Sequence, residues 1–376
     1  MRADAELLER FERGLDLRRP ERSHMPARIL GHGEITTVFE IFADRRPDGS
    51  VAGDSGGDPG DSGGEPGDSG GEPGADPVGS DGFEAAVDAA AYKRMPMFRS
   101  RAEATSYEVL HRDYVAILRE EAGVDVAESD LVWLGLERAS SDVGRHGEPI
   151  VLYIVQERFA ALTTGHEVIR GMGSADARIL LRAVVDETWR VFAFNRRNRG
   201  RLEVGFDAQI SNWVVVGHAG NGAPRLRYID TSTPLMRRFG VEQLDPELFL
   251  RSAPSFLVWI IRRLMLADVL ERYYDVRRVM IDLAANLIKE QRPDLVPVAL
   301  EVINEFLQER VGPHGTGETP ESLGQLEPIS AEEVRSYYRE DARVWRVYLA
   351  FRKIDRLLHR VLRRRYPYLL PGKVTR

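Results

Sequence analysis

The sequence predicts an α+β protein, with a small antiparallel sheet in its first part and mostly helices in its second part. Between residues 28 and 157, short runs of β-branched and aromatic residues alternate with turn residues, which is typical of antiparallel strands. Beyond residue 158, apolar residues recur every three or four positions over long stretches, which is typical of amphipathic helices. A chain of 376 residues is long enough for two domains. We therefore expect an N-terminal helix and lead-in at 1–27, a sheet domain at 28–157 and a helical domain at 158–376.

Composition narrows the classes of site that this protein can contain. There is no cysteine, which excludes disulfides, thiolate zinc sites and cysteine nucleophiles and suits a reducing cytosol. The most apolar run, residues 256–261, is followed at once by two arginines and is too short to span a bilayer. The first ten residues form a charged amphipathic helix pattern instead of a signal peptide. These observations predict a soluble, cytoplasmic protein with no membrane span.

Residues 46–82 form a low-complexity insert in the sheet domain. Between residues 47 and 82 there are nine acids and no Lys or Arg, and the motif Asp-Ser-Gly-Gly begins at Asp54, Asp61 and Asp68. A segment with almost no apolar residues cannot bury enough surface to offset the entropy lost on ordering it, so we predict that the insert is disordered. The formal net charge of −7 comes from this insert, because the remainder of the chain is slightly positive.

The pattern over residues 28–42 predicts a strand, a glycine-rich turn and a second strand. Gly31 and Gly33 allow the backbone of the turn to come close to a bound phosphate. Val38, on the second strand, stands where an apolar side chain would cover a nucleotide base. The alternative interpretation of these glycines is an ordinary hairpin turn.

A third strand is predicted over residues 90–98, and a helix over residues 100–122. On the strand, Ala91 and Lys93 share one face. A small residue two positions before a lysine resembles the third strand of kinases, in which the small side chain leaves room for the adenine and the lysine reaches the phosphates. The alternative for Lys93 is a surface lysine. On the helix, Glu103 begins the apolar face and is the expected partner of Lys93. Glu108, on a more polar face, is the second candidate for the partner of Lys93. The alternative for either residue is an ordinary acid on the solvated surface of the helix.

Two further strands are predicted at 131–137 and 149–155, after which residues 156–159 leave the sheet. Helices are predicted at 164–172 and 174–195, followed by a basic turn at 196–201.

The stretch from Arg201 to Asp230 contains the candidate reactive groups. Asp207 precedes Asn212 by five residues, and Asp230 ends a short strand pattern further along. Two carboxylates and an amide on neighbouring strands and loops offer oxygen ligands to a hard cation such as Mg²⁺. An aspartate that orients a nucleophile, with an asparagine and a second aspartate on the metal, is the arrangement that phosphoryl transfer uses in kinases.

The C-terminal part is predicted to consist of helices, the clearest at 254–275, 276–290 and 296–309. A last helix at 330–366 opens with the capping box Ser330-Ala-Glu-Glu. From residue 339 to residue 376 there are 12 Lys or Arg and three acids. This basic helix can bind nucleic acid or an acidic lipid surface, or it can simply have a solvated polar face.

In their order along the chain, these parts resemble those of the protein kinase-like superfamily, which includes the aminoglycoside and choline phosphotransferases. The resemblance covers about residues 28–235 and implies a bilobal fold, with a small antiparallel-sheet N-lobe with one main helix and a larger, mostly helical C-lobe. It also implies ATP and Mg²⁺ as cofactors. The roles that it implies are nucleotide binding for Gly31, Gly33, Val38 and Ala91, phosphate binding for Lys93 with Glu103 as its partner, a catalytic base at Asp207, and Mg²⁺ binding at Asn212 and Asp230.

The chain departs from that superfamily at three points. The His-x-Asp motif is replaced by Gly205-Phe-Asp207, and no glycine follows Asp230 in the Asp-Thr-Ser that replaces Asp-Phe-Gly. There is also no Ala-Pro-Glu segment after Asp230, which favours a small-molecule phosphotransferase over a protein kinase. The alternative hypotheses are a nucleotide-binding scaffold without turnover (a pseudokinase), favoured by the lost histidine, and a nucleic-acid-binding helical protein, favoured by the basic C-terminal helix.

Overall fold

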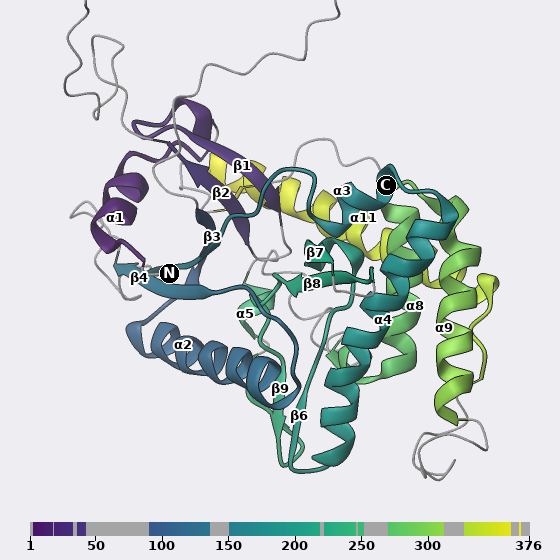
Figure 1. Cartoon of the computed structure of the whole chain (residues 1–376). Coiled ribbons are helices and arrows are strands. Elements are labelled where there is room, and N and C mark those ends of the chain that lie inside the picture. The colour runs from purple at the N-terminus through teal and green to yellow at the C-terminus, as the bar shows by residue number, and fades with distance from the viewer. Residues whose placement is uncertain are drawn as a thin grey trace, which may run out of the picture.

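The computed structural model describes residues 3–17, 19–32, 36–42, 90–135, 150–218, 222–245, 247–251, 270–311, 327–361 and 368–369. Within these ranges the chain is an α+β protein with antiparallel sheets, as the sequence predicts (Figure 1). Several predicted features lie outside the described residues: Gly33, the insert at 46–82, most of the helix at 254–275 and the end of the basic helix beyond residue 361.

A five-stranded sheet forms the first part of the molecule. Its strands are β1 (Ala27–His32), β2 (Thr37–Ile41), β3 (Ala90–Phe98), β4 (Ser129–Gly135) and β5 (Ile150–Glu157), in the spatial order β1-β2-β3-β5-β4. Every neighbouring pair is antiparallel. Successive side chains on a strand point to opposite faces, so β3 and β5 supply apolar residues to both sides of the sheet.

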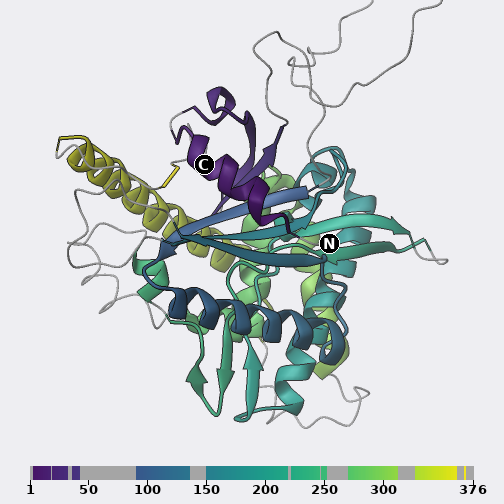
Figure 2. The same ribbon diagram turned by 90° about the vertical axis from the view of Figure 1, so that its left-hand side faces the viewer.

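Helices α1 (Ala5–Gly14) and α2 (Arg101–Ala116) cover opposite faces of this sheet (Figures 1 and 2). The Asp4 side chain caps α1 by accepting a hydrogen bond from the Leu7 amide. Phe11 of α1 packs against Phe39 and Tyr153 of the sheet. On the other face, Tyr107 of α2 packs edge-on against Phe98. The helix predicted to run to residue 122 loses its α-helical pattern after Ala116, where Ile117–Glu121 form a π-helical turn.

Buried polar contacts attach α1 to the sheet. The Glu12 carboxylate accepts hydrogen bonds from Arg94 at 2.5 and 2.8 Å and from the Tyr153 hydroxyl at 2.6 Å. The side chains of Glu12 and Arg94 are only 1% and 3% exposed. Burial alone would lower the pKa of Arg94, but the Glu12 carboxylate beside it raises that pKa above its ordinary value. The guanidinium therefore stays charged inside the fold. Such a pair depends on both partners, because either charge alone would be buried without compensation.

The second part of the molecule consists mainly of helices. The described helices here are α3 (Gly165–Arg170), α4 (Ser174–Arg197), α5 (Glu247–Leu250), α8 (Val276–Lys289), α9 (Val296–Val311) and α11 (Ala331–Val361). The predicted capping box begins α11, because Ser330 and Glu333 exchange hydrogen bonds between side chain and backbone amide. None of the helices in the described ranges is both long enough and apolar enough to cross a membrane.

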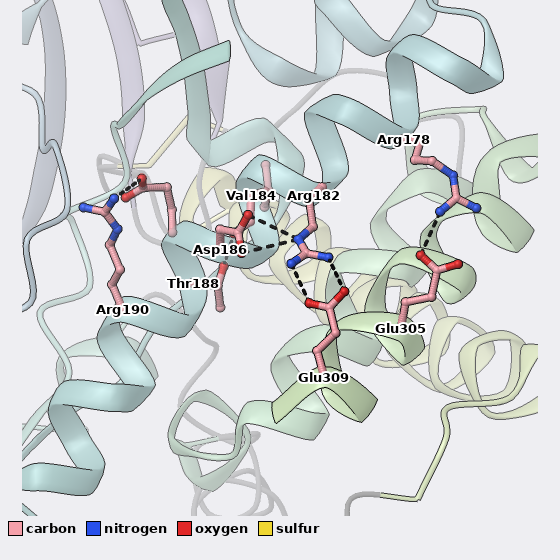
Figure 3. A network of polar contacts seen from close by, with 9 residues as sticks. Arg178, Arg182, Val184, Asp186, Thr188, Arg190, Glu305 and Glu309 are labelled. Carbon is pink, nitrogen blue, oxygen red and sulfur yellow. Dashed lines mark hydrogen bonds and ion pairs between the residues drawn. The ribbon is translucent and has the colours of Figure 1, made fainter. Parts of the chain in front are cut away.

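Helices α4 and α9 lie side by side, with a ladder of ion pairs along the edge of their contact (Figure 3). Arg178 binds Glu305 at 2.9 Å and also Glu301, and Arg182 binds Glu309 at 2.7 Å. These side chains are roughly 40 to 60% exposed. Water screens exposed charges, so each of these pairs stabilises the fold only slightly.

Short strands connect the two parts and carry the loops of interest. Strands β6 (Leu202–Val204), β9 (Met236–Arg238) and β10 (Val241–Glu242) form one small antiparallel sheet, and β7 (Trp213–His218) pairs with β8 (Pro224–Tyr228) in a hairpin. Asp207 follows β6, Asn212 immediately precedes β7 and Asp230 follows β8. The three residues therefore lie at the ends of strands, between the five-stranded sheet and the helices.

We expect Glu12→Ala to lower the free energy of unfolding by about 3–5 kcal/mol, because the Arg94 guanidinium would remain buried without a carboxylate. Arg178→Ala is the matched control and should cost less than about 1 kcal/mol, since its ion pairs are exposed. Urea denaturation of the two variants measures both quantities. Equal losses would contradict the assignment of Glu12 as a buried anchor of α1.

Candidate active site

A row of residues across the sheet forms one wall of the candidate site. Gly31 pairs with Val38, and Val38 pairs with Lys93, across three adjacent strands. Directly paired residues in an antiparallel sheet point to the same face, and Ala91, two residues before Lys93, shares that face. Val38 and Ala91 are half-buried, and the position of a Cβ on Gly31 has no neighbouring atom within 4 Å. The wall therefore presents small and apolar groups beside the lysine.

Lys93 reaches from this wall to the segment that follows β8. Its Nζ donates a hydrogen bond of 2.5 Å to the Ile229 carbonyl and lies 3.9 Å from Oδ1 of Asp230. The side chain is 9% exposed. Burial lowers the pKa of Lys93, and the Asp230 carboxylate opposes that shift. Lys93 is thus a buried cation that faces a carboxylate, unlike the surface lysine that was the alternative.

The predicted pairing of Lys93 with an acid on α2 is not what the structure has. Glu103 lies in the first turn of α2, where it binds Arg251 at 2.6 Å and accepts the Arg99 amide at 2.8 Å. Glu108 pairs with Arg112 of its own helix. The apolar stripe correctly identified the side of α2 that faces the sheet. It did not show that Glu103 lies too near the helix start to reach Lys93.

Further along the same face of α2, three polar side chains contact the site segments. His111 Nε2 lies 2.9 Å from the Thr231 hydroxyl, and the Tyr107 hydroxyl donates to the Ser232 carbonyl. The Tyr114 hydroxyl donates to the Gly205 carbonyl. Burial and the nearby Lys93 charge lower the pKa of His111 to about 3, so the imidazole is neutral. Helix α2 therefore positions the backbone before Asp207 and after Asp230.

Asp207 is held at the end of β6 by contacts on both sides. The Asn195 side chain of α4 makes two hydrogen bonds to the Val204 backbone, which fix the strand. A Cβ on Gly205 would lie 2.8 Å from the Leu235 Cβ, so a histidine such as that of a His-x-Asp motif does not fit at that position. The Asp207 carboxylate accepts a hydrogen bond of 3.0 Å from the backbone amide of Gln209. The loop therefore holds the carboxylate without the motif's histidine.

The charge of Asp207 is disfavoured in the folded protein. Burial raises its pKa to about 7, with further contributions from the negative charges of Asp282 and Asp230. An aspartate with a pKa near neutrality can accept a proton under ordinary conditions and release it again. Acids with strongly shifted pKa values occur often at functional sites.

Asn212 and Asp230 are joined to Asp207 through the backbone between them. The Asn212 side-chain amide donates to the Asp207 carbonyl at 3.3 Å, and the Ile229 amide donates to the Asn212 carbonyl at 2.9 Å. The carboxylate of Asp230 accepts the Ser232 hydroxyl at 2.8 Å. The structure thus brings Lys93, Asp207, Asn212 and Asp230 into one site, although 137 positions separate the first from the last.

The sequence analysis did not identify the polar side chains of α8 that lie behind the Asp207 loop, here called the α8 layer. Gln209 donates to Asp282 at 3.0 Å and accepts from Lys289 at 3.1 Å, while Asn286 accepts the Ile210 amide at 3.0 Å. Asp282, Asn286 and Lys289 occur at spacings of four and three, which places them on one face of the helix. That spacing was the one sequence feature that could have indicated a shared role for these three residues. Its meaning depends on a contact between segments more than 70 residues apart, which the sequence alone does not reveal.

The donor atoms of the site fit a hard divalent cation that also binds a ligand. Within the described ranges, no three His, Asp or Glu side chains gather closely enough to hold a metal by themselves. Asp230 and Asn212 instead offer one carboxylate and one amide oxygen beside Asp207, whose pKa is raised by burial first and then by the negative charges of Asp282 and Asp230. Mg²⁺ is usually held by one or two carboxylates together with phosphate oxygens and water. The residues therefore fit Mg²⁺ bound together with a phosphorylated ligand.

We expect Asp207→Asn to stabilise the ligand-free protein at pH 8 by up to about 4 kcal/mol, since each unit of pKa shift corresponds to about 1.4 kcal/mol. The folded state binds the Asp207 proton more tightly than the unfolded chain, so the wild type loses stability as the pH rises from 3.8 to about 7. The asparagine variant has no such loss, so the difference in free energy of unfolding between the variant and the wild type should vanish near pH 4. Urea denaturation at several pH values measures it, with Asp186→Asn, a half-exposed acid paired with Arg182, as the control. A variant less stable than the wild type at pH 8 would refute the burial of this charge.

Comparison with known proteins assigns the chain to a family but not to an activity. No curated protein matches the sequence. Residues 82–357 match a family of unknown function, DUF6206, and this stretch includes Lys93, Asp207, Asn212 and Asp230 but not Gly31 or Val38. Because the match covers more than half of the chain, the protein belongs to this family of unknown function, DUF6206.

Proposed function

We propose that this protein is an ATP- and Mg²⁺-dependent phosphotransferase that acts on a hydroxyl group of a small molecule. One observation carries the proposal: Lys93, Asp207, Asn212 and Asp230, singled out by their residue types and order in the sequence, meet in one site. A buried lysine, a carboxylate with a pKa near 7 and two oxygen donors are the groups that phosphoryl transfer requires.

Each group has a part in the proposed reaction. Asp230 and Asn212 would hold Mg²⁺, which supplies positive charge to the phosphate oxygens. Lys93 would bind the same phosphates, and Gly31, Val38 and Ala91 would line the base and phosphate side of the nucleotide. Asp207 would orient the acceptor hydroxyl and take its proton. The α8 layer would keep the Asp207 loop in place, so that most of the catalysis is positioning and charge stabilisation.

The arrangement of elements supports a bilobal, protein kinase-like architecture. The five-stranded sheet consists of the hairpin β1–β2, the strand β3 that carries Lys93, and the strands β4 and β5. Helix α2, which comes between β3 and β4 in the chain, covers one face of this sheet. Helices α3 and α4 follow, and the strand ends with Asp207 and Asp230 come next. This is the order of parts that the family resemblance implies, with the site between the sheet and the helices.

A nucleotide-binding module without turnover is the second candidate, because two contacts favour it. The Lys93 amine is bonded to a backbone carbonyl, and Glu103 is held by Arg251. In active protein kinases the equivalent lysine pairs with a glutamate of the helix. Here Asp230 is the acid near Lys93. Turnover therefore requires Lys93 to exchange the carbonyl for phosphate oxygens.

The nucleotide site predicts that ATP stabilises the wild type against heat only when Mg²⁺ is present. At 100 times its dissociation constant the ligand should add about 2.7 kcal/mol of stability. Asp230→Ala removes a metal ligand and should abolish the shift, whereas Asp186→Ala on α4 should retain it. Differential scanning fluorimetry measures all three proteins. The absence of any shift in the wild type would refute both candidate functions.

Turnover separates the enzyme from the binding module. We expect Asp207→Asn to lower the rate of transfer from ATP to an accepted hydroxyl compound by about 10²–10⁴-fold. Its Mg²⁺-dependent thermal shift should persist, because Asp207 is not assigned to the metal. A screen of hydroxyl-bearing acceptors with labelled ATP supplies the assay. If the wild type binds nucleotide but transfers no more label to any acceptor than Asp207→Asn does, the protein is a binding module.

A further inference from the structure

Helix α11 has an exposed apolar stripe on the side away from the rest of the molecule. The stripe consists of Val347, Ile354, Leu357, Leu358 and Val361, whose exposed fractions are 48, 45, 58, 47 and 71%. At 100° per residue these side chains fall within an arc of roughly 100°. The buried residues of the helix, Val334, Ala342 and Arg352, lie on the opposite side of the same helical wheel. Five large apolar side chains on one exposed face are more than the isolated ones that surfaces normally show.

The back of the helix, not the stripe, attaches it to the protein. The first half of α11 packs against α8, where Arg277 binds Glu333 at 2.8 Å. In the second half, the buried Arg352 guanidinium lies over the rings of Tyr348 and Tyr368, at 5.5 and 5.0 Å. Figure 2 shows this half reaching out beyond the sheet and the other helices. The apolar stripe is thus held on an outer edge of the molecule.

A row of basic side chains runs along one border of the stripe. Arg346, Lys353 and Arg360 recur every seven residues and are all exposed. Arg356 is exposed next to them, while the one acid in this half of the helix, Asp355, lies on the other border beside His359. A helix with an apolar face bordered by Lys and Arg can place its apolar side chains among acyl chains and its cations among anionic headgroups.

These features fit a lipid surface better than a second copy of the chain. From Val347 to Val361 the stripe covers about two heptads, fewer than the three or four that identify a coiled coil. In an antiparallel pair the basic borders would also face one another and repel. Nucleic acid would use the cations but leave the apolar stripe exposed to water. A bilayer surface with anionic lipids uses both features.

We propose that α11 docks in the plane of an anionic membrane surface through this stripe and its basic border. This inference is independent of the proposed phosphotransferase activity. The stripe would enter the boundary between headgroups and acyl chains, and Arg346, Lys353 and Arg360 would lie among the headgroup charges. Attachment would be peripheral and reversible, since a single helix lying at the interface is a weak anchor compared with a spanning one.

Co-sedimentation of the full-length protein with vesicles tests the proposal. We expect binding to vesicles of phosphatidylcholine mixed with phosphatidylserine, and at least about tenfold weaker binding to phosphatidylcholine alone. Raising the salt concentration should weaken the binding, because salt screens the headgroup charges. No binding to the mixed vesicles would overturn the proposal.

Two pairs of substitutions separate the contribution of the apolar stripe from that of the basic row. Ile354→Ser with Leu358→Ser removes the centre of the stripe, and Lys353→Glu with Arg360→Glu reverses part of the basic row. Each pair should lower binding to the mixed vesicles by at least about tenfold. Ile179→Ser, at a 50% exposed isoleucine on α4, is the matched control and should bind like the wild type. Circular dichroism and thermal melts confirm that each variant is folded.

Two other outcomes would assign the surface differently and overturn the proposal. Sedimentation velocity could show a dimer that the Ile354 and Leu358 variant loses, which would make a second copy the occupant of the stripe. Alternatively, the protein could bind double-stranded DNA with a strong salt dependence, equally well in the wild type and in that variant. The basic row would then be a nucleic-acid site that does not use the apolar stripe.

Discussion

The contact between the Lys93 ammonium and the segment Ile229–Asp230 joins the sheet to the strand ends that carry the other candidate groups. Lys93 is fixed by its place in β3, between β2 and β5. Its amine donates a hydrogen bond to the carbonyl of Ile229, and the backbone amide of Ile229 donates one to the carbonyl of Asn212. The distances within the site therefore depend on one buried side chain. The hydrophobic packing of the sheet and of α2 holds that side chain in place.

This arrangement concentrates negative charge that the protein does not fully neutralise. Burial raises the pKa of Asp207 and of Asp282, and the negative charges of Asp282 and Asp230 raise the pKa of Asp207 further. The positive charge of Lys289 opposes these two shifts only in part, and Lys93 faces Asp230. A fold selected for stability alone would replace such carboxylates with neutral groups. Their presence is expected where a cation or a reacting proton completes the site.

The sequence was sufficient to predict those features that depend on local patterns. Strands and helices followed from the spacing of apolar residues, as in β3 and α4, and the capping box at Ser330 identified the start of α11. Asp207, Asn212 and Asp230 could be selected because each stands next to a short strand pattern. The partner of Lys93 could not be identified, because the helical stripe gives the side of α2 but not its displacement along the sheet. Asp282 and Lys289 were missed for a related reason: their role arises only from the packing of α8 against a distant loop.

Calorimetric titration of the protein with ATP and Mg²⁺ tests whether Lys93, Asp207, Asn212 and Asp230 form a metal- and phosphate-binding site. Because the pKa of Asp207 is raised to about 7, part of the protein carries a proton on Asp207 at neutral pH, and a bound cation should drive that proton off. We expect binding that requires Mg²⁺ and releases a fraction of a proton, seen as a heat that changes with the ionisation enthalpy of the buffer. In Asp207→Asn the binding should persist without the buffer dependence. Absence of binding, or binding that is indifferent to Mg²⁺, would contradict the account.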